Sequence, residues 1–340
     1  MKAIVTEKVG SWGLREVPVP PPPPGWALIK VRAAAFCATD IEVLDGGIPA
    51  KYPLIQGHEW CGEVVTINGS DQALVGKRVV GSNDVCCLTC PACRRGLWRQ
   101  CPSFGEIGFK HDGAYAEYML APAYALIALP DSIGDIQAAM LEPLGVALGT
   151  LDKADVRLGE TLLSLGSGSI GLNVLAAAKA AGMRRIAVVE RTGGRLKIAR
   201  DMGASYALAS AHCDIEQALR EIYPAGPDVI VDCTGAQSCV RLALSIAPKG
   251  GRVALAGYGG GRETTWRMDD VHVKNLRVVG AGNNWDVLGR AVELVADGLV
   301  STERLCTLTM PIERFDDAVR AARAREPGFV KAVFTFGSGA

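Results

Sequence analysis

From about Gly159 onward, the sequence alternates apolar segments, glycine-containing turns and amphipathic segments. Strands that are apolar along their whole length are typical of a parallel sheet, because helices cover both of its faces. The pattern therefore predicts an α/β fold with a doubly wound parallel sheet. The expected strands are Thr161–Leu165, Ile186–Glu190, Val229–Asp232, Arg252–Ala256 and Leu276–Gly280, with helices such as Asn173–Ala181 and Arg195–Met202 between them.

The chain before about residue 145 has a different pattern, of short β-rich segments separated by Gly, Pro and Asn turns. Segments of this kind, such as Trp26–Arg32 and Gly62–Ile67, predict a partly open barrel or a sandwich. A chain of 340 residues exceeds what one core usually organises, so we expect two domains. The expected divisions are a β-rich domain at 1–147, the parallel sheet at 148–285, and a segment at 286–340 that returns to the first domain.

The overall composition argues against several classes of partner. Lys plus Arg equal Asp plus Glu at 36 each, which removes the positive field that nucleic acids or anionic membranes attract. The amino terminus lacks the apolar core of a signal peptide, and the apolar stretches are shorter than a membrane span. We therefore expect a cytoplasmic protein that acts on a small molecule.

A glycine-rich motif stands between the first expected strand of the sheet and the helix that follows. It reads Gly166-Ser167-Gly168-Ser169-Ile170-Gly171, a G-x-G-x-x-G in the strand-to-helix context. Backbone N–H groups at such a helix start, together with the helix dipole, bind a diphosphate that side chains would exclude. We expect Gly166, Gly168, Ser169, Ile170 and Gly171 to bind a dinucleotide.

An acidic residue follows this motif at the end of the next strand. Glu190 lies 19 residues after Gly171, where a carboxylate can accept hydrogen bonds from the adenosine ribose hydroxyls. Its charge would repel a ribose phosphate, so the sequence predicts NAD rather than NADP. Arg191 and Arg195 lie close enough to soften this preference or to stack on adenine. The alternative is a solvent-exposed glutamate at a strand end.

Four cysteines are spaced C-x2-C-x2-C-x7-C at Cys87, Cys90, Cys93 and Cys101, in a lobe at about residues 84–103. Four thiolates at such spacing form a closed tetrahedral zinc site, which offers no open position for chemistry. This lobe is poor in core residues, so a metal would hold it together. Similar sites occur in nucleic-acid-binding modules, an alternative that the neutral charge disfavours. The spacing excludes Cys86 as a ligand.

A second set of potential metal ligands is dispersed along the chain: Cys37, His58, Glu59 and Glu142. Each of them alone is more often a structural residue. Together they supply a thiolate, an imidazole and carboxylates, the mixture found at a catalytic zinc that keeps one position for water or substrate. The sequence therefore predicts two zinc ions per chain, one catalytic and one structural.

At these residues the chain resembles the zinc-dependent medium-chain dehydrogenases. The shared motifs are G-H-E-x-x-G-x-V at 57–64, the four-cysteine lobe, D-G-A-Y-A-E-Y at 112–118, the glycine loop and the C-T-G after Asp232. The resemblance implies a GroES-like catalytic domain, a Rossmann domain that binds the cofactor, contacts of Thr234 and Asn283 with that cofactor, and a homodimer or homotetramer. Simple alcohol dehydrogenases tend to carry cysteine at the position of Glu142, so the resemblance is to the polyol branch.

In that branch Cys37, His58 and a glutamate hold the metal, and the resemblance leaves open whether the glutamate is Glu59 or Glu142. It places the hydroxyl of Thr39 on the proton-relay path. The relay commonly continues through a histidine five residues after the metal cysteine, and this chain has Glu42 there. Either Glu42 takes the proton, or the path runs through water or Glu59.

The expected activity is NAD-linked oxidation of a secondary alcohol in a polyol, sugar or aminocyclitol. An NADP-preferring reductase and an L-threonine or amino-alcohol dehydrogenase are alternatives on the same scaffold. A cofactor-fold protein without turnover and a zinc-free quinone or enone reductase are disfavoured by the metal ligands. By analogy with the family, the candidates to line the cleft are Trp60, Phe104, Ile107 and Trp285, although the aromatic residues among them are equally suited to packing between domains. Glu106 or Asn284 would bind further hydroxyls or an amine of the substrate.

Overall fold

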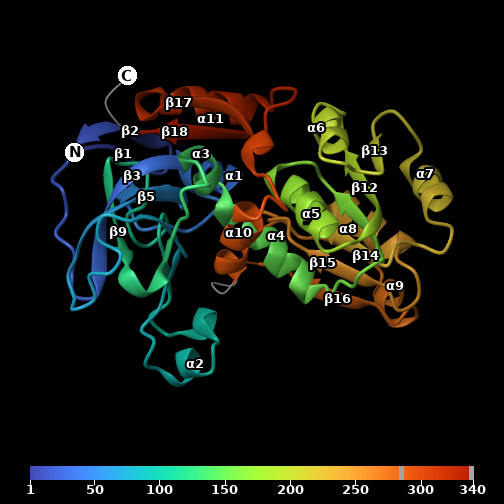
Figure 1. Ribbon diagram of the computed structural model, residues 1–340. Coiled ribbons are helices and arrows are strands. Elements are labelled where there is room, and N and C mark those ends of the chain that lie inside the picture. The colour runs from blue at the N-terminus through green and yellow to red at the C-terminus, as the bar shows by residue number, and fades with distance from the viewer. Residues whose placement is uncertain (283–286, 337–340) are drawn as a thin grey trace.

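The computed structural model describes residues 1–282 and 287–336. It has two parts side by side: a β-rich part that includes the N-terminus and a part built on a parallel sheet (Figure 1). The expected α/β class, with a doubly wound parallel sheet beside a β-rich part, is confirmed. The predicted contacts of Asn283, Asn284 and Trp285 fall outside the described residues.

The parallel sheet has six strands in the order β13-β12-β11-β14-β15-β16. Its strands are β11 (Thr161–Leu165), β12 (Arg184–Glu190), β13 (Tyr206–Ala209), β14 (Val229–Asp232), β15 (Arg252–Leu255) and β16 (Arg277–Gly280). The helices around it are α4 (Leu141–Lys153), α5 (Ser169–Ala180), α6 (Leu196–Asp201), α7 (Ile215–Ile222), α8 (Gln237–Ile246), α9 (Met268–His272) and α10 (Val287–Ala296).

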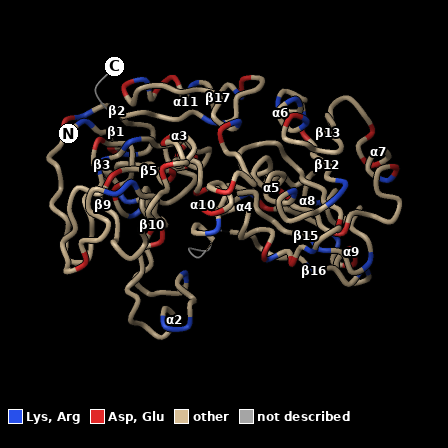
Figure 2. The backbone as a smooth tube through the Cα atoms, viewed as in Figure 1, with Lys and Arg blue, Asp and Glu red and all other residues tan. Residues whose placement is uncertain are grey.

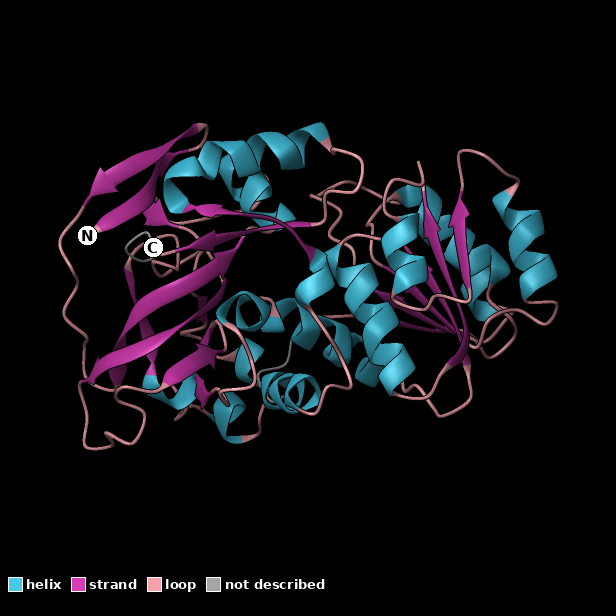
Figure 3. Ribbon diagram, turned by 45° about the horizontal axis from the view of Figure 1, so that its top comes forward, coloured by secondary structure: helices cyan, strands magenta, loops and turns pink. Residues whose placement is uncertain are grey.

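Both faces of this sheet are covered, which explains why its strands are apolar throughout. Successive residues of one strand point to opposite faces, so Leu162 packs in the core beneath α4, α5 and α10, whereas Leu163 packs beneath α7 and α8. Figure 3 shows helices on either side of the strands. The chain order reverses beside β11, and the crevice at the carboxyl ends of β11 and β14 is where such sheets bind ligands.

The β-rich part contains a seven-stranded sheet, in the order β10-β6-β5-β3-β18-β17 with β9 also on β3, and the three-stranded sheet β2-β1-β4. Its first strands are β1 (Lys2–Lys8), β2 (Ser11–Glu16), β3 (Trp26–Ala35), β4 (Leu54–Ile55), β5 (Glu59–Ile67), β6 (Arg78–Gly81), β9 (Tyr118–Pro122) and β10 (Leu126–Ala128). Its shorter elements are α1 (Ala38–Leu44), η2 (Ala123–Ala125) and α3 (Asp135–Ala139).

The end of the chain joins this β-rich part. It forms η3 (Glu303–Leu305), β17 (Cys306–Pro311), η4 (Ile312–Arg314), α11 (Phe315–Ala324) and β18 (Lys331–Thr335). Strand β18 pairs antiparallel with β3, where Val333 lies opposite Ala35. Phe334 and Phe315 pack on Tyr115, with ring centroids 5.4 Å and 5.2 Å away. Residues from the two ends of the sequence therefore share one core.

A small lobe projects from the β-rich part, below it in Figure 1. It consists of β7 (Asp84–Val85), α2 (Pro91–Arg94), η1 (Trp98–Gln100) and β8 (Gly105–Glu106). Basic and acidic residues are interspersed over both parts of the molecule (Figure 2), as expected for a net charge of zero. No helix within the described residues is long and apolar enough to cross a membrane.

Two details of the sheet differ from the sequence-based prediction. The pattern analysis misses β13, because this half-exposed edge strand is only four residues long and two of its residues are alanine, which gives a weak strand signal. Helix α5 begins at Ser169 rather than at Asn173, so that its first turn follows directly on Gly168. The glycine loop thus leads straight into a helix N-terminus, the arrangement that binds phosphate.

Candidate active site

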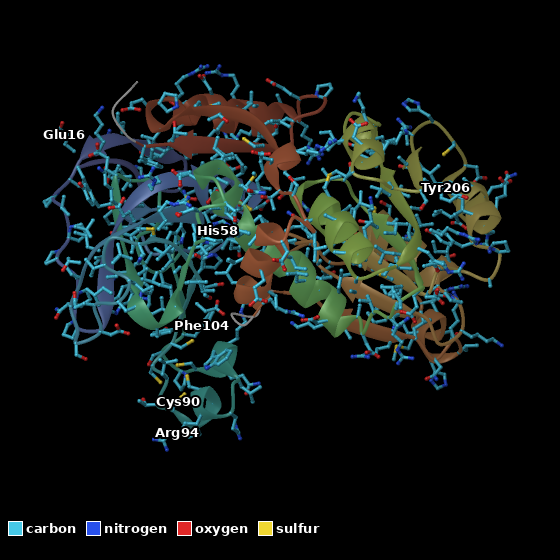
Figure 4. The ribbon with its side chains drawn as sticks, viewed as in Figure 1. Glu16, His58, Cys90, Arg94, Phe104 and Tyr206 are labelled. Carbon is cyan, nitrogen blue, oxygen red and sulfur yellow. The ribbon has the colours of Figure 1, made fainter. Side chains whose placement is uncertain are left out.

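Three of the predicted metal ligands come together in the structure. One ligand atom from each of Cys37, His58 and Glu59 lies within 4.8 Å of the others. Strand pairing brings them together, because Ala35 at the end of β3 lies opposite Glu59 at the start of β5. Figure 4 shows His58 on the side of the β-rich part that faces the parallel-sheet part.

The polar side chains of this group are buried and have few protein partners. Glu59 lies 2.5 Å from Lys331 Nζ, and His58 Nδ1 lies 3.5 Å from Asp40 Oδ1, a contact too long for a well-formed hydrogen bond. Unpaired buried polar atoms are costly unless something satisfies them. A thiol, an imidazole and a carboxylate around one point form a donor set that suits zinc, so these residues fit the metal that their spacing predicts.

Asp40 stands behind the imidazole, a role that the sequence analysis did not assign. Its Oδ1 lies 3.5 Å from His58 Nδ1, and its Oδ2 accepts hydrogen bonds from the Cys37 backbone N–H (2.8 Å) and the Tyr115 hydroxyl (2.5 Å). Because the carboxylate faces Nδ1, the other ring nitrogen of His58 is left for a metal. The sequence signal was its position three residues after Cys37, typical of a carboxylate that caps a helix start.

Lys331 is a second supporting residue that sequence reasoning missed. Its Nζ donates to Glu59 Oε1 at 2.5 Å and to the Phe36 carbonyl at 3.3 Å, and it is only 1% exposed. Burial lowers the pKa of Lys331, but the negative charges of Glu59, Cys37 and Asp40 and the hydrogen bond to Glu59 together outweigh this effect and raise the pKa above its usual value. No local pattern marks this lysine, because β18 reaches Glu59 only through sheet pairing.

The other predicted residues of this site lie around the group. Glu142 is the second residue of α4 and is not among the three whose ligand atoms lie within 4.8 Å. The Thr39 hydroxyl lies 3.4 Å from Cys37 Sγ. Glu42 Oε2 lies 3.4 Å from the point that a Cβ on Gly260 would occupy, so it faces the loop after β15 of the other part.

Two of the expected cleft residues are instead core residues. Trp60 and Ile107 are 2% and 0% exposed, so neither offers surface to a substrate. Trp60 bonds through its indole N–H to Asn83, whose amide donates to the His58 carbonyl. Trp60 and Ile107 are apolar residues next to the end of a strand, and a sequence alone does not distinguish such core residues from residues that line a cleft. The ring of Phe109, which was not predicted, lies 5.1 Å from that of His58.

The remaining two expected cleft residues lie at the lobe. The Arg99 guanidinium covers the Phe104 ring at 5.5 Å and donates to Glu106 Oε1 at 2.7 Å. Arg99 also lies 3.6 Å from Asp84. The carboxylate of Glu106 therefore already has a cationic partner, which weakens its predicted role as a ligand for substrate hydroxyls or amines.

The four predicted cysteines of the lobe form the other group of metal-ligand residues within the described chain. Cys87 Sγ lies 3.6 Å from Cys101 Sγ and 4.0 Å from Cys93 Sγ. The backbone N–H of Cys90 donates to the Cys87 sulfur, which favours a thiolate. The neighbouring Cys86 is not in the group. Figure 4 shows Cys90 at this lobe, apart from His58.

The glycine loop has two kinds of glycine. A Cβ on Gly171 would lie 1.9 Å from the Gly166 carbonyl oxygen, and Gly166 itself has φ +106° with Thr234 beside it. These two glycines are needed for the turn itself. At Gly168 the nearest atom to such a Cβ is Arg195 Nη1, 3.9 Å away, so the protein leaves space there.

This space and its surroundings fit a dinucleotide. The hydroxyls of Ser167 and Ser169 are buried without a hydrogen-bond partner, at a helix N-terminus that attracts phosphate. Glu190 ends β12, and its Oε2 accepts the backbone N–H of Arg195 at 3.0 Å. Ile170 is half-buried in the loop and Arg191 is exposed. The Thr234 hydroxyl donates a hydrogen bond to Asp232 at 2.6 Å, and the methyl group of Thr234 lies beside Gly166 of the glycine loop.

Comparison with known proteins identifies the family of this chain. Residues 23–131 match the alcohol dehydrogenase GroES-like domain and residues 169–296 match the zinc-binding dehydrogenase domain. The chain is 30% identical to an L-threonine 3-dehydrogenase of Chelativorans sp. (strain BNC1), over 97% of this chain and 98% of that protein. The chain belongs to the zinc-binding medium-chain dehydrogenases.

Two further members of this dehydrogenase family are similar to the chain over nearly its whole length. The chain is 32% identical to an erythritol/L-threitol dehydrogenase of Mycolicibacterium smegmatis, over 93% of this chain and 92% of that protein. A zinc-binding dehydrogenase from Sinorhizobium meliloti 1021, solved with NADP, superposes with a TM-score of 0.93 at 30% identity, covering 98% and 99% of the two chains. This chain is therefore an oxidoreductase of the family that includes alcohol, polyol and threonine dehydrogenases.

Proposed function

We propose that this dehydrogenase oxidises a secondary alcohol of a polyol, sugar or aminocyclitol to a ketone. The alcohol carbon gives a hydride to NAD⁺ and its oxygen loses a proton, which yields the ketone, NADH and H⁺. The observation that carries the proposal is the buried group Cys37, His58 and Glu59, whose ligand atoms lie within 4.8 Å of one another. Glu142, near the start of α4, is the fourth proposed ligand and would exchange with Glu59.

Zinc held by these residues would supply Lewis acidity toward the alcohol oxygen, and the cofactor would accept the hydride. Asp40 holds the imidazole of His58 in one orientation. Thr39, whose hydroxyl lies 3.4 Å from Cys37 Sγ, would receive the hydroxyl proton of the substrate. Glu42, on the same helix and close to Gly260, would take this proton onward.

NAD is the proposed cofactor, because the Glu190 carboxylate at the end of β12 would repel the ribose phosphate of NADP. The Sinorhizobium structure holds NADP, so the same scaffold also accepts that cofactor. The ratio of kcat/KM for the two cofactors tests the preference. Glu190→Ser should raise the relative use of NADP, and an enzyme that prefers NADP before any substitution contradicts the proposal.

The proposed metal content is two zinc ions per chain, the second held by Cys87, Cys90, Cys93 and Cys101. Elemental analysis tests it directly. We expect two zincs in the purified protein and one in a Cys37→Ser variant, which should keep its fold and lose turnover. Wild-type protein that contains no zinc after expression in zinc-supplemented medium contradicts both ligand assignments.

The substrate class is tested with NAD and a panel of polyols, sugar alcohols, inositols and amino alcohols, including L-threonine and erythritol. L-threonine oxidation is the second candidate, favoured by the named threonine dehydrogenase that matches almost the whole chain. Turnover of only primary alcohols, or of no alcohol by the zinc-loaded protein, contradicts the proposal. A homodimer or homotetramer in the cytoplasm is also proposed, and light scattering after size exclusion would measure the assembly.

A further inference from the structure

A cavity of about 460 Å³ lies in the β-rich part of the molecule, a volume typical of small-molecule sites. It is enclosed by the proline-rich loop before β3, the segment at 51–55, the turn at 110–113 and β9. Figure 1 shows β9 on the side of this part that faces away from the parallel sheet. None of the described lining residues belongs to the proposed metal ligands or to the glycine loop, so the cavity is separate from both sites.

Rings form much of the lining of this cavity. Trp26, at the start of β3, has its ring centroid 5.6 Å from that of His111, and Tyr118 of β9 also lines the cavity. Pro20 and Pro23 add two pyrrolidine rings. Flat and cyclic groups of this kind pack well against another ring, so the lining favours a cyclic ligand.

The proline-rich loop at 20–24 is fixed before any ligand binds. The pyrrolidine ring restricts φ at each proline. The Asn68 side-chain amide donates to the Pro22 carbonyl at 2.8 Å, and the Trp26 backbone N–H donates to the Pro23 carbonyl at 3.0 Å. A wall that is already ordered costs little conformational entropy when a ligand packs on it.

Several polar groups among the lining side chains are available to a ligand. Within the part of the chain that the structure describes, the side chains of four lining residues have no hydrogen-bond partner: Lys51, Trp26, Tyr118 and His111. The ammonium and the indole N–H can only donate, and the hydroxyl and the neutral imidazole can each donate once. This set offers more donors than acceptors, so it suits a ligand whose polar group accepts hydrogen bonds.

The charge around the cavity is positive. Neither Lys51 nor Lys110 forms an ion pair within the described residues, and Asp112 is the one carboxylate among the described lining residues. Lys110 Nζ donates to the Phe104 carbonyl at 2.8 Å, whereas Lys51 Nζ has no such bond. Burial and the charges of the two lysines lower the pKa of His111, although the aspartate opposes them. One ammonium is therefore left to pair with a single negative charge.

We propose that this cavity binds a small ring compound that carries a carboxylate. The ring packs against Trp26, Tyr118 and the prolines, and the carboxylate accepts a charge-assisted hydrogen bond from Lys51. A carboxylate carries the single charge that one free ammonium can balance, whereas a phosphate would call for more cations. The inference is independent of the proposed alcohol oxidation, because it uses no residue of that site.

Fluorine NMR on the zinc-loaded protein tests this site without turnover. The probes are para-fluorobenzoate and its neutral amide, para-fluorobenzamide. The carboxylate should bind at least about fivefold more tightly than the amide, as expected for one ion pair with an exposed lysine. Lys51→Gln should remove this difference, and Trp26→Leu should weaken both probes. Lys77→Gln is the matched control, because this exposed lysine of the same part does not line the cavity and should change neither affinity.

A carboxylate can also bind zinc, so the Cys37→Ser variant shows which site the probe occupies. This variant should bind para-fluorobenzoate as wild type does, and a loss of binding in it alone would place the probe on the metal and overturn the proposal. Wild-type protein that binds the two probes equally or not at all, or Lys51→Gln and Trp26→Leu variants that both retain wild-type affinity, would also overturn it. Tighter binding of para-fluorophenyl phosphate would overturn the choice of a carboxylate. Melting temperatures show whether each variant is folded.

Discussion

Lys331 Nζ lies 2.5 Å from Glu59 Oε1 at a place where both side chains are almost wholly buried. The pair joins the last strand, β18, to the start of β5, 272 residues apart in the sequence. A buried charge whose partner is removed has neither water nor a counter-ion to stabilise it. The ion pair therefore fixes a proposed metal ligand to the last strand of the chain.

Lys331→Met should accordingly lower the free energy of unfolding by about 3–5 kcal/mol, measured by urea denaturation of the zinc-free protein. Lys2→Met is the matched control, because it removes an exposed lysine whose ion pair with Glu313 is open to solvent, and it should change stability little. The double variant Lys331→Met with Glu59→Gln should recover part of the loss. Equal stability of Lys331→Met and wild type would show that Glu59 does not depend on this lysine.

Gly168→Ala should abolish cofactor binding and leave the fold intact, because among the described residues outside its own segment an added Cβ meets only Arg195, at 3.9 Å, but would fill the space for a diphosphate. Gly171→Ala should instead destabilise the protein, because its Cβ would lie 1.9 Å from the Gly166 carbonyl oxygen. Melting temperature and NAD affinity, measured on both variants, separate the two effects. An alanine at 168 that binds NAD normally would contradict the assignment of this loop.

Glu42→Gln should lower kcat for alcohol oxidation at neutral pH, because the amide cannot accept the proton that leaves along α1. Binding of NAD should be unaffected, so kcat falls while the cofactor dissociation constant stays constant. Glu42→His should restore part of the rate, since imidazole can also accept a proton. A pH–rate profile of the glutamine variant that matches wild type would exclude Glu42 from proton transfer.

Cys90→Ser should remove the zinc of the lobe and leave one zinc per chain. The lobe has little apolar core, so its local stability depends on the metal, and we expect faster proteolysis within residues 84–103. Cys86→Ser is the control, because Cys86 stands outside the four-cysteine group and should keep two zincs. Loss of zinc from Cys86→Ser and not from Cys90→Ser would contradict the ligand spacing.

Much of the fold can be predicted from the sequence because its signals are local. The apolar strands β11 and β14 coincide with the expected segments, since a strand buried on both faces shows a continuous apolar run. Strand β13 was missed because it is only four residues long and two of these residues are alanine, which gives a weak strand signal. For Trp60 the sequence left open cleft lining and packing, and its burial, which depends on neighbours distant in sequence, decides for packing.

The sequence by itself determined the family and which residue types are offered to metal and phosphate, because cysteine spacing and the glycine loop are properties of short segments. Only the tertiary structure decided what supports them. Asp40 faces His58 because β3 and β5 pair, Lys331 reaches Glu59 because β18 joins that sheet, and Arg195 meets Phe329 because the end of the chain returns to the β-rich part. These contacts join residues far apart in the chain, and a pattern within a short segment does not predict which distant segment will pair with it.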